Sequence, residues 1–179
     1  MKKHLFLWQL AGVVFTAALG TLLHFLFNWT QLPSFAPISA VNESTWEHMK
    51  LLFLPSFFFA LIQFCFFRRE FPNFWWVKLV GICFGTLLIP ILFYIVNGAF
   101  VKTPDWLNIV FFFLAVIFSY LLELFLLQND YLLFRVPLLA ISTLFSIALL
   151  FGVFTFYPPK LPLFQDPITS SYGIIYAAP

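Results

Sequence analysis

The chain has 179 residues, of which 63% are hydrophobic, 22% are aromatic and only 9% are charged. A soluble domain carries roughly 25% charged residues, so this composition excludes one and indicates an integral membrane protein. The net charge of +2 comes without a basic run, so we expect membrane lipid, and no nucleic acid, as the partner.

Five apolar segments each have the length that a helix needs to cross a hydrocarbon layer about 30 Å thick. Backbone groups inside lipid must be paired within their own segment, so each segment is expected to be an α-helix. The first is too long for the apolar core of a signal peptide, about 7–15 residues, so we expect it to stay in the membrane. The predicted spans cover residues 5–29, 44–67, 74–96, 106–127 and 131–156, and a proline-rich tail follows over 157–179.

The basic residues predict how this five-helix bundle is oriented, because short cytoplasmic loops carry an excess of lysine and arginine. An inside N-terminus places six of the nine basic residues near the cytoplasm, among them Lys2, Lys3, Arg68 and Arg69. We therefore expect an all-α integral membrane protein with its N-terminus inside, its C-terminus outside and an extracytoplasmic tail.

Residues 42–50 concentrate the polar chemistry of the chain, with two carboxylates, an imidazole, an ammonium and an indole. Ser44 and Glu47 have the spacing of a capping box, so part of this run is explained as the start of the second helix. His48 and Lys50 lie deeper, where polar and charged side chains are costly in lipid. Capping does not explain these two residues.

Folding the predicted spans back and forth places other polar residues at the depth of this run. Helical spacing puts Glu43, Glu47 and Lys50 on one face, and His24 lies about 7–8 Å below the outer end of the first span. Because imidazole and carboxylate groups bind divalent metals, His24, Glu47 and His48 are candidate metal ligands. A polar pocket without metal and simple helix capping are open alternatives.

This outer face is expected to form a pocket with catalytic or ligand-binding residues. In an enzyme, Glu47 or His48 would act as general base and Lys50 would stabilise developing charge. The tail is interpreted either as a lid over the pocket or as an interfacial anchor. The residues expected to bind a ligand are His24, Glu43, Trp46, Asp105 and Asp166.

A second polar layer is expected at the cytoplasmic ends of the spans, where Glu123 and Arg135 are predicted to pair on adjacent helices. Gly81 and Gly85 form a small-xxx-small pair, which permits close approach of another helix and is a candidate surface for a homo-oligomer. The members of the second layer are Gln9, Gln63, Lys78, Glu123 and Arg135.

Two motifs stand out, NESTWEH at residues 42–48 and PLFQDP at residues 162–167, the latter followed by Tyr172 and Gly173. With them the chain resembles a family of small, uncharacterised bacterial multi-pass membrane proteins, classed as a domain of unknown function. The resemblance covers essentially the whole chain and implies a location in the bacterial cytoplasmic membrane. It implies no activity and no functional residue.

The sequence therefore predicts a class of protein but no single reaction. We expect binding or sensing of a lipid head group, a small solute or a cation at the outer face. One alternative is a membrane-embedded enzyme acting on a lipid-linked substrate. Another is a small transporter, although few polar residues bridge the middle of the predicted spans.

Overall fold

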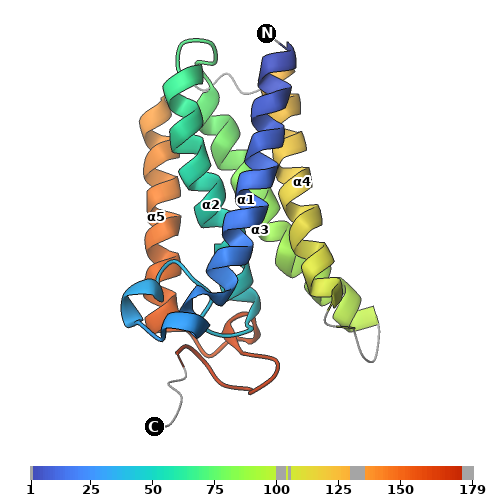
Figure 1. Ribbon diagram of the computed structural model, residues 1–179, viewed down its shortest axis with the longest axis vertical. Coiled ribbons are helices and arrows are strands. Elements are labelled where there is room, and N and C mark those ends of the chain that lie inside the picture. Colours follow the sequence, from blue (N-terminus) through green and yellow to red (C-terminus); the bar gives the residue numbers. More distant parts are fainter. Residues whose placement is uncertain (1, 100–103, 105, 130–135, 175–179) are drawn as a thin grey trace.

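The computed structural model describes residues 2–99, 104, 106–129 and 136–174. Five long helices make up most of this part of the chain (Figure 1), and two short 3₁₀ turns, Pro33–Phe35 and Pro162–Phe164, accompany them. Each long helix is long and apolar enough to cross a membrane, as the composition predicts. They are α1 (Lys2–Thr30), α2 (Thr45–Phe67), α3 (Phe74–Ala99), α4 (Trp106–Asn129) and α5 (Pro137–Phe156).

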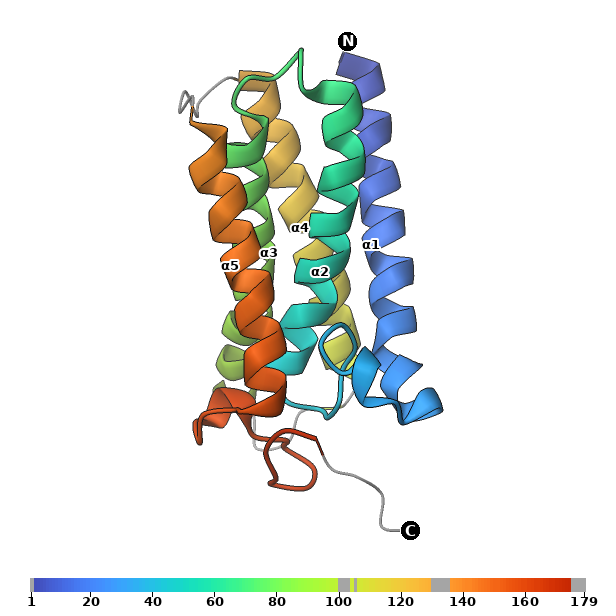
Figure 2. The ribbon, with the colours of Figure 1, turned by 90° about the vertical axis from the view of Figure 1, so that its left-hand side faces the viewer.

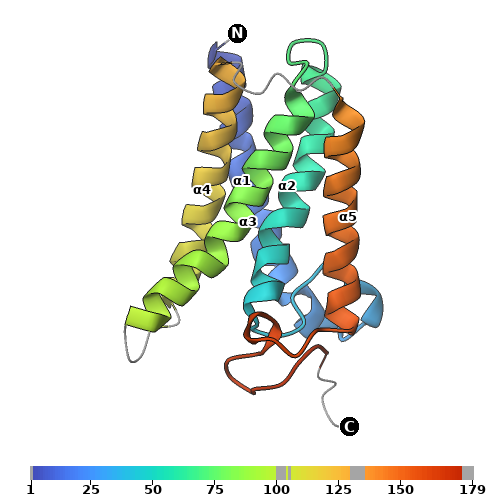
Figure 3. The same cartoon turned by 180° about the vertical axis from the view of Figure 1, so that it is seen from behind.

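The helices run back and forth, so an odd number of them puts the start of α1 and the segment after α5 at opposite ends of the bundle (Figures 1 and 2). We call the end that carries residues 30–44 and 157–174 the tail end. There α3 and α4 lean away from α5 and the tail, which is clearest from behind (Figure 3). The tail end is therefore built by α1, α2, α5 and the two irregular segments.

The central helix is α2, which packs against α1, α3 and α5. Its apolar residues are spread over every side of the helix, a pattern typical of a helix surrounded by others. Two thirds of its most apolar window, 67%, is buried inside the bundle, whereas the corresponding share for α5 is 22%. Residues on α2 are thus the best placed in the chain to be held rigidly.

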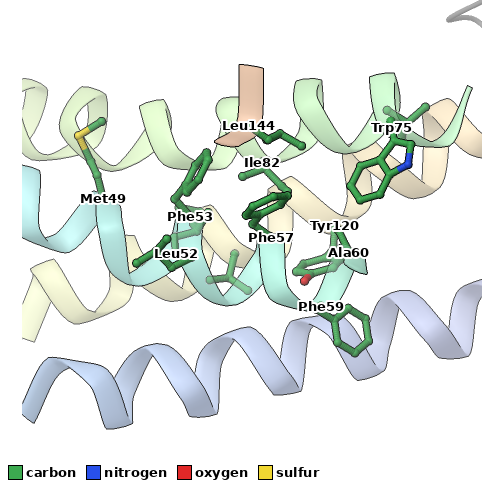
Figure 4. Close-up of a cluster of buried hydrophobic side chains, with 14 of the residues drawn as sticks. Met49, Leu52, Phe53, Phe57, Phe59, Ala60, Trp75, Ile82, Tyr120 and Leu144 are labelled. Carbon is green, nitrogen blue, oxygen red and sulfur yellow. The ribbon is translucent and has the colours of Figure 1, made fainter. Parts of the chain in front are cut away.

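Aromatic and aliphatic side chains fill the space around α2 (Figure 4). Phe53 is fully buried and its ring lies 5.2 Å from that of Phe151 on α5. Leu144 on α5 and Ile82 on α3 are also fully buried in this cluster. Close packing of this kind fixes the rotation of α2 about its own axis. It therefore also fixes the direction of the polar side chains in the first turns of α2.

The outer surface of the bundle is strongly apolar. Large side chains such as Leu138 and Leu149 are 72% and 68% exposed. Contiguous apolar surface of this extent is unfavourable in water and is the expected exterior of a protein dissolved in lipid.

Two helix starts differ in detail from the sequence expectation. Pro137, expected inside a span, lies in the first turn of α5, where a missing N–H costs nothing. At α2, the Ser44 hydroxyl accepts the Glu47 N–H at 3.4 Å, so half of the predicted capping box is present. The other half is not formed, because the Ser44 N–H is donated to the Asn42 side chain and the Glu47 carboxylate points elsewhere.

The glycine pair on α3 serves packing within the chain. A Cβ at Gly81 would collide with the Glu123 side chain, and one at Gly85 would lie 2.6 Å from the Cβ of Ser119. The Ser119 hydroxyl also donates to the Gly81 carbonyl at 2.8 Å. The Gly81/Gly85 face is therefore packed against α4 of the same chain, and formation of a homo-oligomer stays a prediction.

Candidate functional site

Three polar side chains from three segments meet at the tail end. His24 lies on α1, Glu43 in the irregular segment before α2, and His48 in the first turns of α2. The segment folds back onto α1, where the Ala40 N–H is donated to the Leu23 carbonyl at 3.3 Å. This return brings Glu43 alongside His24.

The carboxylate of Glu43 lies between the two imidazoles. Its Oε1 is 3.8 Å from His24 Nε2, and its Oε2 is 3.5 Å from His48 Nε2. The two rings are 5.4 Å apart between centroids. One ligand atom from each residue can be chosen so that all three lie within 4.8 Å of one another. We call these residues the His24–Glu43–His48 cluster.

The hydrogen bond on the far side of His48 determines what its ring presents to Glu43. His48 Nδ1 lies 2.9 Å from the Ser44 carbonyl oxygen. A carbonyl only accepts, so Nδ1 carries the proton and, in the neutral ring, Nε2 carries a lone pair 3.5 Å from the carboxylate. Two electron-rich groups face each other there, and a cation between them, a proton or a metal ion, makes the arrangement favourable.

The two distances from the Glu43 carboxylate to the imidazoles, 3.5 and 3.8 Å, are close to those between neighbouring ligands of a single metal ion. Bonds of about 2.0 Å place neighbouring ligands of a tetrahedral ion about 3.3 Å apart. A backbone carbonyl that accepts from the second nitrogen is the usual support for a metal-binding imidazole, and His48 has it. Three protein ligands would leave one position of a tetrahedral ion open, and the three side chains are 23–38% exposed.

Glu47, predicted as a metal ligand and catalytic base, lies in a separate buried network. Its Oε2 is 2.6 Å from Lys50 Nζ, and its Oε1 accepts the Thr155 hydroxyl at 3.0 Å. Lys50 Nζ also donates to the Ala36 carbonyl at 2.9 Å and to Thr155 at 2.8 Å. Glu47 is 2% exposed and Lys50 0%. This network ties α2 to α5 and to the segment before α2.

Of the other predicted ligand-binding residues, two lie beside the cluster and one lies outside the described residues. Trp46 is packed against aromatic rings of α5 and of the tail, with Phe151 at 4.5 Å and Phe164 at 4.7 Å between centroids. Asp166 is buried and its Oδ2 accepts the Glu43 N–H at 3.4 Å. Trp46 therefore holds the start of α2 against α5 and the tail, and Asp166 holds the backbone of Glu43. Asp105 lies outside the described residues.

At the opposite end of the bundle, the second polar layer contains a buried ion pair between Lys78 and Glu123. Arg135, predicted to pair with Glu123, lies outside the described residues, so that pairing stays a prediction. Gln9 and Gln63 are also buried at this end.

Three buried hydroxyl side chains meet in the middle of the bundle, and the sequence did not predict this group. The Thr16 hydroxyl lies 2.8 Å from the Tyr120 hydroxyl and 3.3 Å from that of Ser56, and all three side chains are buried. Thr16 and Ser56 each occupy the midpoint of their helix, which is the one signal in the sequence that groups them.

The fold and the cluster define a class, a multi-pass membrane protein with a partly exposed His-Glu-His cluster at one end of a helical bundle. More specifically, the chain belongs to the family of unknown function DUF6512, whose profile matches residues 1–174. No curated protein and no solved structure matched the chain.

Proposed function

We propose that the protein binds a divalent transition-metal ion at the His24–Glu43–His48 cluster, at the extracytoplasmic face of a bacterial cytoplasmic membrane. The observation that carries the proposal is the bond from His48 Nδ1 to the Ser44 carbonyl, which leaves Nε2 of the neutral ring without a proton, 3.5 Å from Glu43 Oε2. The location rests on the distribution of basic residues, which favours an inside N-terminus and an outside tail.

The donor set indicates the kind of metal. Two imidazoles and one carboxylate suit zinc and neighbouring first-row ions, whereas magnesium and calcium prefer oxygen ligands alone. Zinc is the natural first probe because it is redox-inert and accepts a three-ligand site that keeps one position open.

The other functions expected from the sequence have less support. Glu47 and Lys50 are paired with each other, and both are hydrogen-bonded to Thr155. A substrate would have to displace these partners before either residue could act as a base or as a stabilising cation. Transport would need a polar route from the cluster to the mid-bundle hydroxyls. Buried apolar side chains such as Leu52 and Phe53 occupy that interval on α2.

The test is zinc binding to the full-length protein purified in detergent with a tag that contains no histidine. We expect about one zinc per chain in the wild type, measured by elemental analysis after removal of free metal. His24→Ala and His48→Ala are each expected to weaken zinc binding by at least about tenfold, since even supporting residues contribute that much to affinity.

The chain offers matched controls at the other end of the bundle. His4, the third histidine, and Glu70 are exposed there, so His4→Ala and Glu70→Gln should bind zinc as the wild type does. Glu43→Gln keeps the size of the ligand and removes its charge, and should bind like the histidine variants. A wild type without zinc, or zinc retained in both His24→Ala and His48→Ala, would refute the proposal.

A further inference from the structure

The tail contacts α2 and the segment before it, and packs against a buried group to which α1 contributes. Its Phe164, buried in the 3₁₀ turn after α5, packs on the ring of Trp46, which lies between Glu43 and His48 in the sequence. The α2 helix and this turn are thus joined next to two of the three proposed ligands.

The tail also holds the backbone that carries Glu43. The Glu43 N–H is donated to Asp166 Oδ2 at 3.4 Å, and the Asn42 amide donates to the Gly173 carbonyl at 2.9 Å. Asp166 is itself held, since its Oδ1 accepts the N–H groups of Ile168 at 2.7 Å and Thr169 at 3.2 Å. These bonds place two successive residues of the ligand-bearing segment against an ordered loop.

The third connection is to a buried group to which α1 contributes. Ile174 packs against a small buried group formed by Phe27, Ala36 and Val41. Phe27 lies three residues beyond His24 on the same helix, and Val41 lies two residues before Glu43. The end of the described tail therefore packs against a group that is formed jointly by the two segments that carry His24 and Glu43.

We propose that metal binding and tail docking are coupled: the docked tail holds Glu43 in ligating position, and a bound metal holds the tail on the bundle. This inference rests on the proposed function and adds a means of regulation to the same site. The tail then acts as the part of the protein that reports metal occupancy at this face of the membrane.

The physical reason is the position of Glu43 outside any helix. Residues 36–44 must be ordered before Glu43 can meet the two imidazoles, and ordering a segment costs conformational entropy. A docked tail has already ordered it, so the metal binds more tightly. Coupling of this kind is reciprocal, so the factor by which the tail tightens metal binding equals the factor by which metal stabilises docking.

The experiment measures both sides of this equality on the full-length protein in detergent. Zinc affinity is measured by titration, and tail docking by hydrogen exchange of the amides at residues 165–173 with and without zinc. Zinc should slow exchange in the wild type, by about 5–150-fold if the coupling is typical of allosteric proteins. Phe164→Ala, which removes the contact with Trp46, should weaken zinc binding by a similar factor and abolish the zinc-dependent slowing.

A second variant tests the coupling independently, in case Phe164→Ala does not fold. Asn42→Ser keeps an oxygen that can accept the Ser44 N–H but has no amide to donate to Gly173. It should show the same paired losses. The matched control is Ile168→Ala, because Ile168 lies in the same loop and is 77% exposed. It should leave both measurements unchanged.

The results separate the two proposals. A wild type that binds no zinc overturns the proposed function and this inference together. Zinc binding with unchanged tail exchange, and with the same affinity in Asn42→Ser as in Ile168→Ala, overturns the coupling and leaves the metal site standing. Slower exchange with zinc together with weaker binding in Asn42→Ser establishes the coupling.

Discussion

Replacing Lys50 with methionine is expected to destabilise the protein by about 3–5 kcal/mol, the usual cost of removing one partner from a buried ion pair. The Glu47 carboxylate would remain 2% exposed and keep the Thr155 hydroxyl and the Val41 N–H as donors, without its cation. The loss is measured by unfolding the purified protein in detergent with increasing denaturant. It should exceed that of any exposed lysine.

The control for this prediction is Lys160→Met, which removes an exposed lysine of the tail and should change stability by less than about 0.5 kcal/mol. Adding Glu47→Gln to Lys50→Met removes both charges and should recover part of the loss, because the uncompensated carboxylate is gone. If Lys50→Met were as stable as Lys160→Met, the network would not hold α2 to α5 as described.

The five helices were predictable because lipid leaves the backbone few choices. Segments of this length and hydropathy can satisfy their backbone only as helices, so α2, α3 and α4 begin within one residue of the expected positions. How the helices face one another was not predictable, since apolar residues cover every side of them. Glu123 illustrates this limit: depth predicted Arg135 as its partner, whereas its ion pair with Lys78 follows from the packing of α3 against α4.

At the candidate site, too, the depth of a residue in the bundle was predictable and the direction of its side chain was not. Counting residues from the span ends placed His24 and His48 in one layer, and the structure sets their rings 5.4 Å apart. The choice of carboxylate depended on direction. Helical spacing put Glu43 and Glu47 on one face, but α2 begins at Thr45, so Glu43 lies outside the helix. The Ala40–Leu23 bond and the turn at Asn42, which direct Glu43 to His24, have no signature in hydropathy.

The second large effect is expected at Gly20, on α1 one turn before His24. A Cβ at this position would lie 2.6 Å from the Leu51 carbonyl oxygen and 2.7 Å from the Phe112 ring. A backbone carbonyl of α2 cannot swing aside as a side chain can, so Gly20→Ala must push α1 away from α2. Overpacking of this kind costs about 1–3 kcal/mol, although alanine is the better helix former.

Because His24 and His48 sit on the two helices that are pushed apart, Gly20→Ala should also weaken zinc binding, and more than its loss of stability alone would require. The matched control is Gly98→Ala on α3, where a Cβ would meet nothing within 4 Å. That variant should keep or slightly raise stability and bind zinc normally. Equal stability of the two variants would mean that α1 and α2 are not in close contact at Gly20. Lower stability of Gly20→Ala with undiminished zinc affinity would show that the distance between His24 and His48 does not limit metal binding.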